Sequence, residues 1–243
     1  MKNKVKLVGT LISNFVFSHE IYGENFYEAT LKVDRLNTEH SDEIPIVVSD
    51  RLINVQDCEA GTRLSIDGQF RSHNKAVEDQ PRKKLILSVF AKDATIITDT
   101  NAFDEDAEPS ESDTEVEGDA FEEKVHTPTS SDENEIELLG FICKEPLYRK
   151  TPLGRDITDC VLAVNRRYGK SDYIPCIAWG RNSKYLANLR IGTCVEIKGR
   201  IQSRIYKKRI SETETISKTV YEVSISYITE AKDSYKEDNT DNN

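Results

Sequence analysis

The sequence has few of the patterns that mark metal sites, membrane spans or catalytic centres. Its five cysteines and four histidines form no Cys-x-x-Cys pair and no Cys/His cluster, which argues against a zinc site. No apolar run approaches the roughly 18–20 residues that a membrane helix needs. There is no phosphate-cradling glycine loop and no nucleophile elbow. We therefore expect a non-enzymatic cytoplasmic protein with reduced thiols, no catalytic residues, no metal and no cofactor.

Charge is unevenly distributed along the 243 residues. The whole chain carries a formal net charge of −10. Residues 1–100 carry −2 and residues 138–231 carry +8, whereas residues 101–137 carry −14. The last stretch, residues 232–243, carries −2. A basic block of this size is compatible with a polyanionic partner, although the net charge of the whole chain is negative.

The acidic segment also differs from the rest in composition. Residues 99–135 combine acidic runs such as Asp104-Glu105-Asp106 with many Ser, Thr and Pro residues. Such a segment cannot bury enough apolar surface to offset the entropy lost on folding. We therefore predict a disordered acidic linker over residues 99–135 and a disordered tail over residues 232–243.

An internal repeat organises the remainder. Three blocks of the first half recur in the second at one offset of 131 positions: residues 29–35, 61–62 and 66–68 match residues 160–166, 192–193 and 197–199. One offset kept over three separated blocks indicates a duplicated domain. We assign the first copy to residues 1–98 and the second to residues 136–231.

Each copy has the pattern of a small β-protein. Apolar and polar residues alternate along Leu31-Lys32-Val33-Asp34, as in a half-buried strand. Glycines mark the expected strand ends, at Gly23, Gly61, Gly68, Gly154, Gly169, Gly192 and Gly199. The helix-like stretches are short, at residues 51–59 and 182–190. Three strands, a short helix and a hairpin predict an all-β chain of two five-stranded OB-fold barrels, with a β-sandwich as the structural alternative.

The second copy also carries a family resemblance. Its residues 176–192 read CIAWGRNSKYLANLRIG and its residues 195–206 read VEIKGRIQSRIY. With LAVNR at residues 162–166, these strings resemble the bacterial single-stranded DNA-binding proteins over about residues 136–230. The first copy resembles the same superfamily more weakly, and its residues 44–49 are also similar to the primosomal protein N branch.

This resemblance implies a nucleic-acid site in the second copy. The stacking aromatics of the family fall at Tyr173, Trp179 and Tyr206, and a strand separation of six puts the first two on one face. Cations for the phosphates surround them, at Arg166, Arg167, Arg181, Arg204, Lys207, Lys208 and Arg209. Tyr148 and Tyr168 are further candidates. The structural alternatives are a tryptophan in the core and a solvated basic hairpin.

The first copy departs from that pattern. Its residues at the three stacking positions are Glu43, Ser49 and Lys75, although Arg51 and Arg71 remain as cations. We interpret it as a degenerate OB-fold domain that has lost most base stacking. It would extend the phosphate path, pair with another subunit or dock a protein.

Together these features predict a sequence-nonspecific single-stranded DNA-binding protein that acts in replication, repair or recombination. Stacking accepts every base, so specificity should be low. Since the family commonly assembles four OB folds, two per chain imply a homodimer, with replication or repair proteins as further partners and no membrane. The alternative is a primosome-like protein-interaction module with secondary nucleic-acid binding. RNA binding shares the same features.

Overall fold

The computed structural model describes residues 2–36, 38–75, 84–97, 132–209 and 215–231, and within these it leaves the side chains of residues 207–209 and 215–216 undescribed. The predicted linker up to residue 131 and the predicted tail therefore lie outside the described residues. The second half begins slightly earlier than expected, because its first strand starts at Glu133.

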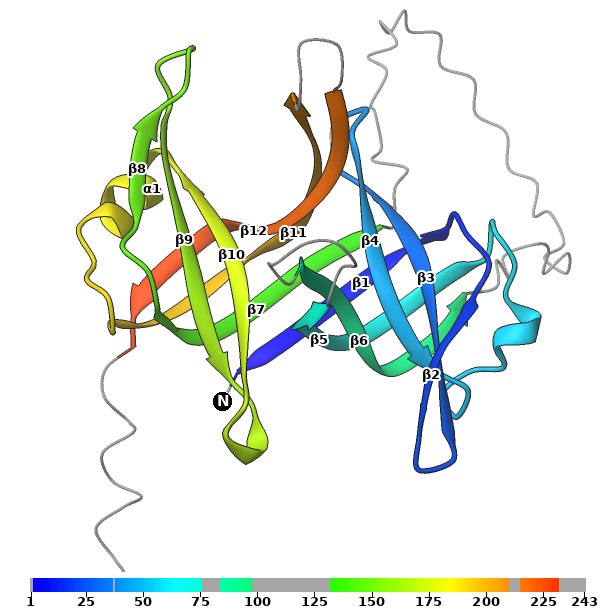
Figure 1. Cartoon of the computed structure of the whole chain (residues 1–243). Helices are drawn as coiled ribbons and strands as arrows, with labels where there is room; N and C mark the ends of the chain where they lie inside the picture. Colours follow the sequence, from blue (N-terminus) through cyan, green and yellow to red (C-terminus); the bar gives the residue numbers. More distant parts are fainter. Residues whose placement is uncertain (1, 37, 76–83, 98–131, 210–214, 232–243) are drawn as a thin grey trace, which may run out of the picture.

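The two halves have the same order of elements. The first half contains β1 (Asn3–Leu11), β2 (Val16–Ile21), β3 (Glu24–Asp34), β4 (Ser41–Ser49), the 3-10 turn η1 (Val55–Asp57), β5 (Arg63–Lys75) and β6 (Lys84–Ile97). The second contains β7 (Glu133–Ile142), β8 (Leu147–Lys150), β9 (Asp156–Asn165), η2 (Arg167–Gly169), β10 (Ser171–Trp179), α1 (Gly180–Ala187), β11 (Cys194–Arg209) and β12 (Thr215–Glu230). The predicted duplication is thus visible as two halves that lie side by side (Figure 1).

Strand pairing closes five strands of each half into a barrel. In the first half β1 pairs with β3 and β5, and β3 pairs with β4. β6 closes the ring, because it pairs in parallel with β4 and antiparallel with β5. The strands β7, β9, β10, β12 and β11 repeat this ring. Apolar side chains such as Leu7, Leu31, Leu138 and Leu162 are buried inside. The all-β prediction with five-stranded barrels is confirmed, and the β-sandwich alternative is not what the chain adopts.

Three local expectations differ from the structure. A sixth strand, β2 or β8, adds to the outer edge of β3 or β9, and its largely exposed residues left no alternation to detect. The helix expected over residues 51–59 shortens to η1, because Asn54 accepts a hydrogen bond from the Gln56 N–H and closes a tighter turn. The helix expected over residues 182–190 is α1, which begins two residues earlier, at Gly180, and ends three residues earlier, at Ala187. No helix in the described part of the chain is long and apolar enough to cross a membrane.

Two of the glycines that we expected at strand ends lie inside strands. Gly68 and Gly199 mark β-bulges in β5 and β11, where the pairing register shifts. A Cβ at Gly199 would fall against the carbonyl oxygen of Ser224, and one at Gly68 against that of Phe90. Close approach of a neighbouring backbone, and not a turn, therefore requires glycine at both positions.

The halves are joined by pairing of their first strands. β1 and β7 run antiparallel from Asn3 opposite Leu138 to Val8 opposite Glu133, so one sheet continues through both barrels (Figure 1). Further contacts repeat across the junction in equivalent pairs. The Ser72 N–H donates to Asp172 (2.6 Å) and the Ser203 N–H donates to Asp42 (2.8 Å). The two copies are thus related by an approximate two-fold axis within one chain.

Candidate nucleic-acid interface

The strand β10 presents two of the three predicted aromatics outward. Tyr173 is 48% exposed and Trp179 is 40% exposed, whereas Ile174 and Ala178 between them are buried. The strand period of two puts the two aromatic rings on the outer face and the buried residues on the barrel side. Trp179 therefore does not belong to the core, which removes the structural alternative for this residue.

The chain after Trp179 turns directly into α1. Gly180 has a φ of 54°, which glycine adopts at little cost, and the helix starts there. Ser183 and Leu186 are buried and hold α1 on the barrel, with the Thr158 hydroxyl donating to the Ser183 carbonyl (2.9 Å). Arg181 is left exposed on the first turn. A short, anchored helix thus fixes an aromatic ring and a cation side by side in the chain.

Tyr206 lies on a different part of the molecule. It is 49% exposed on the β11–β12 hairpin, which rises beside β4 of the first half in Figure 1. Three residues earlier, the Ser203 hydroxyl accepts a hydrogen bond from the Glu43 N–H (3.0 Å). Among the described side chains, no ring contact joins Tyr206 to Tyr173 or Trp179. The predicted trio is therefore not one cluster.

The opposite hairpin completes the surface around Tyr173. The Tyr173 N–H donates to the hydroxyl of Ser72 (2.8 Å), which lies on β5 of the first half. This is the two-fold equivalent of the contact between Glu43 and Ser203. Each β3–β4 or β9–β10 face is thus bordered by the hairpin of the other half.

Arg166 has a structural role that the sequence did not reveal. Its guanidinium forms a two-pronged ion pair with Asp172, with Nε donating at 2.7 Å, and it also donates to the Ser72 carbonyl (2.8 Å). Asp172 is fully buried. An ion pair of this kind fixes the halves against each other, and it leaves Arg166 less of its charge for a phosphate.

The other predicted cations divide into paired and unpaired side chains. Arg204 donates to Glu222 (3.1 Å) and so also carries a partner. Arg167 and Arg181 are exposed and make no ion pair within the described residues. For Lys207, Lys208 and Arg209 only the backbone of β11 is described, so their predicted contacts lie outside the described side chains.

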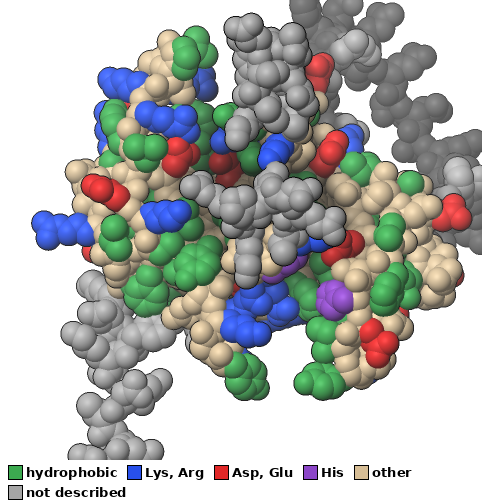
Figure 2. All heavy atoms as spheres, in the orientation of Figure 1, with side chains coloured by type: hydrophobic (Ala, Val, Ile, Leu, Met, Phe, Trp, Pro, Cys, Tyr) green, Lys and Arg blue, Asp and Glu red, His purple; other side chains and the backbone are tan. Residues whose placement is uncertain are grey.

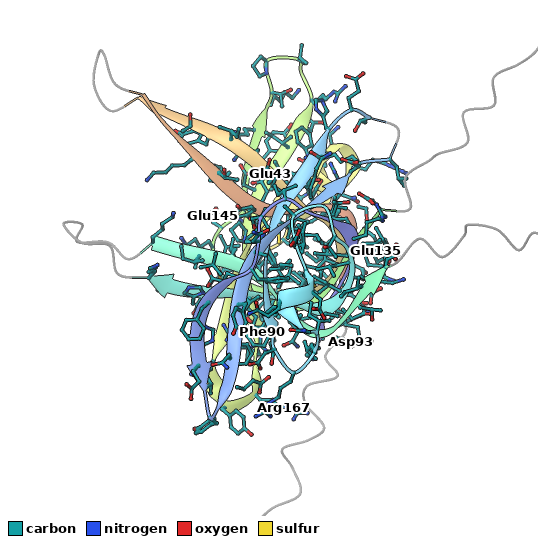
Figure 3. The ribbon with its side chains drawn as sticks, turned by 90° about the vertical axis from the view of Figure 1, so that its right-hand side faces the viewer. Glu43, Phe90, Asp93, Glu135, Glu145 and Arg167 are labelled. Atoms are coloured by element: carbon teal, nitrogen blue, oxygen red, sulfur yellow. The ribbon has the colours of Figure 1, made fainter. Side chains whose placement is uncertain are left out.

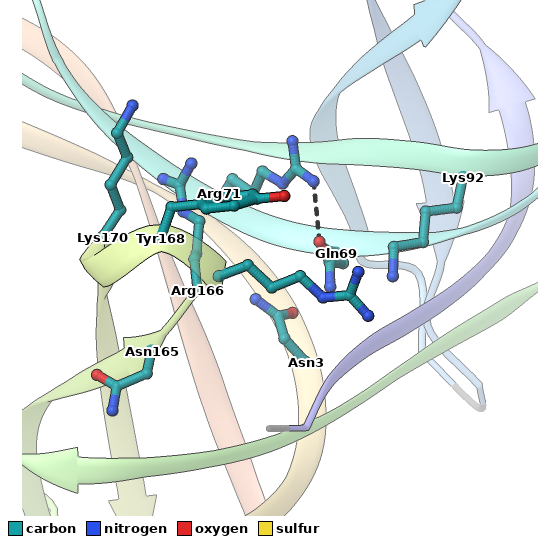
Figure 4. Close-up of a pocket in the computed structure, with 9 residues that line it drawn as sticks. Asn3, Gln69, Arg71, Lys92, Asn165, Arg166, Tyr168 and Lys170 are labelled. Atoms are coloured by element: carbon teal, nitrogen blue, oxygen red, sulfur yellow. Dashed lines mark hydrogen bonds between the residues drawn. The ribbon is translucent and has the colours of Figure 1, made fainter.

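A basic pocket opens where the two halves meet. It has a volume of about 790 Å³ and is lined by Asn3, Gln69, Arg71, Lys92, Asn165, Arg166, Arg167, Tyr168 and Lys170 (Figure 4). Lys and Arg side chains gather in a hollow on the lower part of the molecule in Figure 2. Sequence reasoning missed Lys92 and Lys170. The basic run Arg166–Lys170 could have indicated Lys170. Nothing in the sequence repeat indicates that Lys92, on β6 of the first copy, lies against the second copy.

Tyr168 stands at the edge of this pocket. It is 96% exposed and has a φ of 64°, in the left-handed region that non-glycine residues rarely adopt. Backbone conformations of this kind often occur at functional sites. Of the two additional tyrosines, Tyr148 is instead occupied, since its hydroxyl donates to Asp156 (2.5 Å).

The equivalent positions of the first half offer no aromatic face. Glu43 is exposed and lies in the upper half of Figure 3, whereas Arg167 lies near the bottom. Ser49, the equivalent of Trp179, is buried and donates to Glu24. A buried serine cannot stack a base, and a glutamate repels phosphate.

The family model described as "Single-strand binding protein family" matches residues 133–228. This part of the chain is similar to the single-strand binding protein family. The match begins at the first residue of β7 and ends in β12, so it spans nearly all of the second barrel.

Curated relatives match a stretch of similar length. Single-stranded DNA-binding protein 2 from Listeria innocua is 34% identical over 98 residues, which cover 36% of this chain and 62% of that protein. Single-stranded DNA-binding protein A from Bacillus subtilis is 33% identical over 98 residues, covering 36% of this chain and 57% of that protein. The chain thus spans less than two thirds of the length of these relatives.

Solved structures resemble the chain over more of its length. Wild-type single-stranded DNA binding protein from Thermus aquaticus has a TM-score of 0.65 and 17% identity, covering 95% of this chain and 93% of that one. This likeness confirms the predicted OB fold in both halves. The N-terminal domain of PriB protein from Thermoanaerobacter tencongensis is 43% identical and covers 40% of this chain and 97% of that one, with a TM-score of 0.34.

Proposed function

We propose that the chain binds single-stranded DNA without sequence preference, mainly through its single-strand binding family domain, during replication, repair or recombination. The observation that carries this proposal is the outer face of β10. Two exposed aromatic rings, Tyr173 and Trp179, share that face, and the unpaired cation Arg181 follows them. Aromatic faces for bases and cations for phosphates are what binding of a single strand needs.

The second half keeps a positive net charge when the bounds of its strands are used. Starting it at Glu133 adds three carboxylates to residues 138–231 and lowers their +8 to +5. Two of these carboxylates form ion pairs with the start of the chain: Glu133 pairs with Lys6 of β1, and Glu137 pairs with Lys2, which precedes β1. They are therefore largely neutralised at the junction and oppose a polyanion less than the count implies.

The direct test uses Trp179, which is the only tryptophan of the chain. Titration with poly(dT) should quench its fluorescence, because a base stacks on the indole. Repeating the titration over a range of salt should give a falling affinity, with about −0.7 in the log–log slope for each phosphate contacted. Unchanged emission at saturating DNA, together with a slope near zero, would contradict the proposal. A matched poly(U) titration separates DNA from RNA preference.

A second candidate function rests on the first half. The β2–β3 hairpin exposes Val16, Phe17 and Tyr22, the last fully, along an edge strand of the sheet. Exposed apolar side chains on a sheet edge suit a protein contact, as in a primosome-like interaction module.

We also infer a homodimer, in which two chains bring four barrels together. Sedimentation mass with and without Phe17→Ser tests whether this hairpin forms the contact between chains.

A further inference from the structure

The basic pocket at the junction contains no acidic lining residue. Five of its nine lining side chains are cationic, namely Arg71, Lys92, Arg166, Arg167 and Lys170. Arg166 is neutralised by Asp172 outside the lining. Within the described residues the other four make no ion pair. Four uncompensated cations around one hollow repel one another, and an anion would relieve that repulsion.

Arg71 shows this repulsion most directly. Its guanidinium lies 4.0 Å from the centroid of the Phe90 ring and donates one hydrogen bond to Gln69 (2.9 Å). Its Nε is buried and finds no acceptor among the described residues. Burial and the neighbouring Arg166 charge lower the pKa of Arg71 from its usual value. A cation with an unused donor beside a second cation is suited to an incoming oxyanion.

The pocket is drawn from both halves and adjoins the aromatic face. Arg71 and Lys92 come from β5 and β6 of the first half, while Arg167 and Lys170 come from the η2 turn of the second (Figure 4). Ser72, next to Arg71 in the chain, bonds to the backbone of Tyr173. The backbone of Tyr173 therefore lies next to a strand segment that lines the pocket.

We propose that this pocket is a phosphodiester-binding site built by the two halves together, which leads a bound strand from β10 onto the first half. The proposal rests on the proposed function. Guanidinium and ammonium groups recognise phosphate oxygens, and phosphate contacts carry no sequence information. A volume of about 790 Å³ exceeds the need of one phosphate group and fits a stretch of backbone. The first half thus contributes charge where it has lost stacking.

The test removes one exposed cation from each half. The double variant Lys92→Gln/Lys170→Gln should fold normally, since both side chains are exposed and unpaired. One OB fold covers roughly 4–16 nucleotides, so we compare oligothymidylates of about 6 and about 35 nucleotides. The long oligomer should lose about tenfold in affinity at low salt, and its salt slope should fall by about 1.4 for two lost contacts. The short oligomer should bind almost as the wild type does.

The control is Lys144→Gln/Arg190→Gln, which removes the same charge from exposed residues outside the pocket. Equal losses in variant and control would overturn the proposal, because only the overall field would then matter. Polyglutamate binding that is lost in the pocket variant while DNA binding is retained would also overturn it, in favour of an acidic protein partner. If wild-type protein leaves Trp179 emission unchanged with every oligomer, the proposed function itself fails and this site fails with it.

Discussion

The two junction pockets occupy equivalent positions and have opposite charge. The basic pocket has five cations, whereas its counterpart of about 370 Å³ is lined by Asp34, Arg35, Leu36, Thr38, Asp42, Asp132, Glu133, Asn134, Glu135 and Arg200. Asn165 and Arg167 correspond to Asp34 and Leu36 in the repeat. The barrels have kept their core while the surface at the junction has changed. The shared fold is therefore a poor guide to which half binds a ligand.

The largest difference between the two halves is expected when the aromatic residues of the second half and the equivalent residues of the first half are replaced in separate variants. Tyr173→Ala/Trp179→Ala should weaken single-strand binding by about 1–3 kcal/mol for each lost stack, hence about 30-fold or more in total. Glu43→Ala/Ser49→Ala should leave affinity unchanged or slightly increased, because a carboxylate is removed. Fluorescence anisotropy of a labelled oligothymidylate measures both. Similar losses in the two variants would mean that both halves bind through these positions.

Two neighbouring arginines separate structural from binding roles. Arg166→Ala leaves the buried carboxylate of Asp172 without its partner and should lower the free energy of unfolding by about 3 kcal/mol. Arg167→Ala should leave stability unchanged and weaken DNA binding, since its side chain is exposed and unpaired. Urea unfolding and an oligomer titration on each variant give the two readouts. Equal stability of both variants would contradict the role of the Arg166–Asp172 ion pair in fixing the two halves against each other.

The smallest expected effect concerns the charged contacts of β1 with β7. Hydrogen bonds from Lys198 and Lys2 lower the pKa of Glu137 from 4.5 to about 2. The folded state favours the ionised carboxylate, so its contribution is fully present above pH 4.5 and is lost as the pH falls through about 2. Because the group is partly exposed, Glu137→Gln should cost at most about 1 kcal/mol at pH 7.

Urea unfolding at pH 7 and near pH 2 checks this dependence. The difference between wild type and Glu137→Gln should shrink at the lower pH. In the repeat Glu137 corresponds to Lys6, whose one ion pair among the described residues is with Glu133. Lys6→Gln should therefore have a smaller effect than Glu137→Gln, and a larger one would contradict the assigned role of the Lys2–Glu137–Lys198 contacts.

The repeat and the alternation of apolar residues were enough to predict two five-stranded barrels. Leu31 and Val33 point inward because a half-buried strand requires it, and that requirement is written in the local sequence. The strands β2 and β8 escaped prediction because they bury almost nothing. Gly68 and Gly199 were misplaced because a turn and a close backbone approach select the same residue.

The site was predictable only where one strand carried it. Tyr173 and Trp179 share a strand, so the period of two was sufficient to place them on one face. The structural role of Arg166 was not predicted, because its partner Asp172 and the Ser72 carbonyl meet it only in the folded chain. Lys92 had no local signal at all. A repeat states that two units are alike, but it does not state which edges of the units pair.

The covalent link between the copies has a consequence for the direction of binding. A symmetric dimer of identical barrels offers a DNA strand two equivalent orientations, because its two-fold axis exchanges the sites. In this chain the pairing of β1 with β7 preserves the approximate two-fold axis between the barrels. The two orientations are no longer equivalent, because one junction pocket is basic and the other is acidic. If a strand runs from the β10 face into the basic pocket, as we propose, we expect it to have one preferred 5′-to-3′ polarity. Oligomers labelled at one end and read by energy transfer from Trp179 should report that polarity.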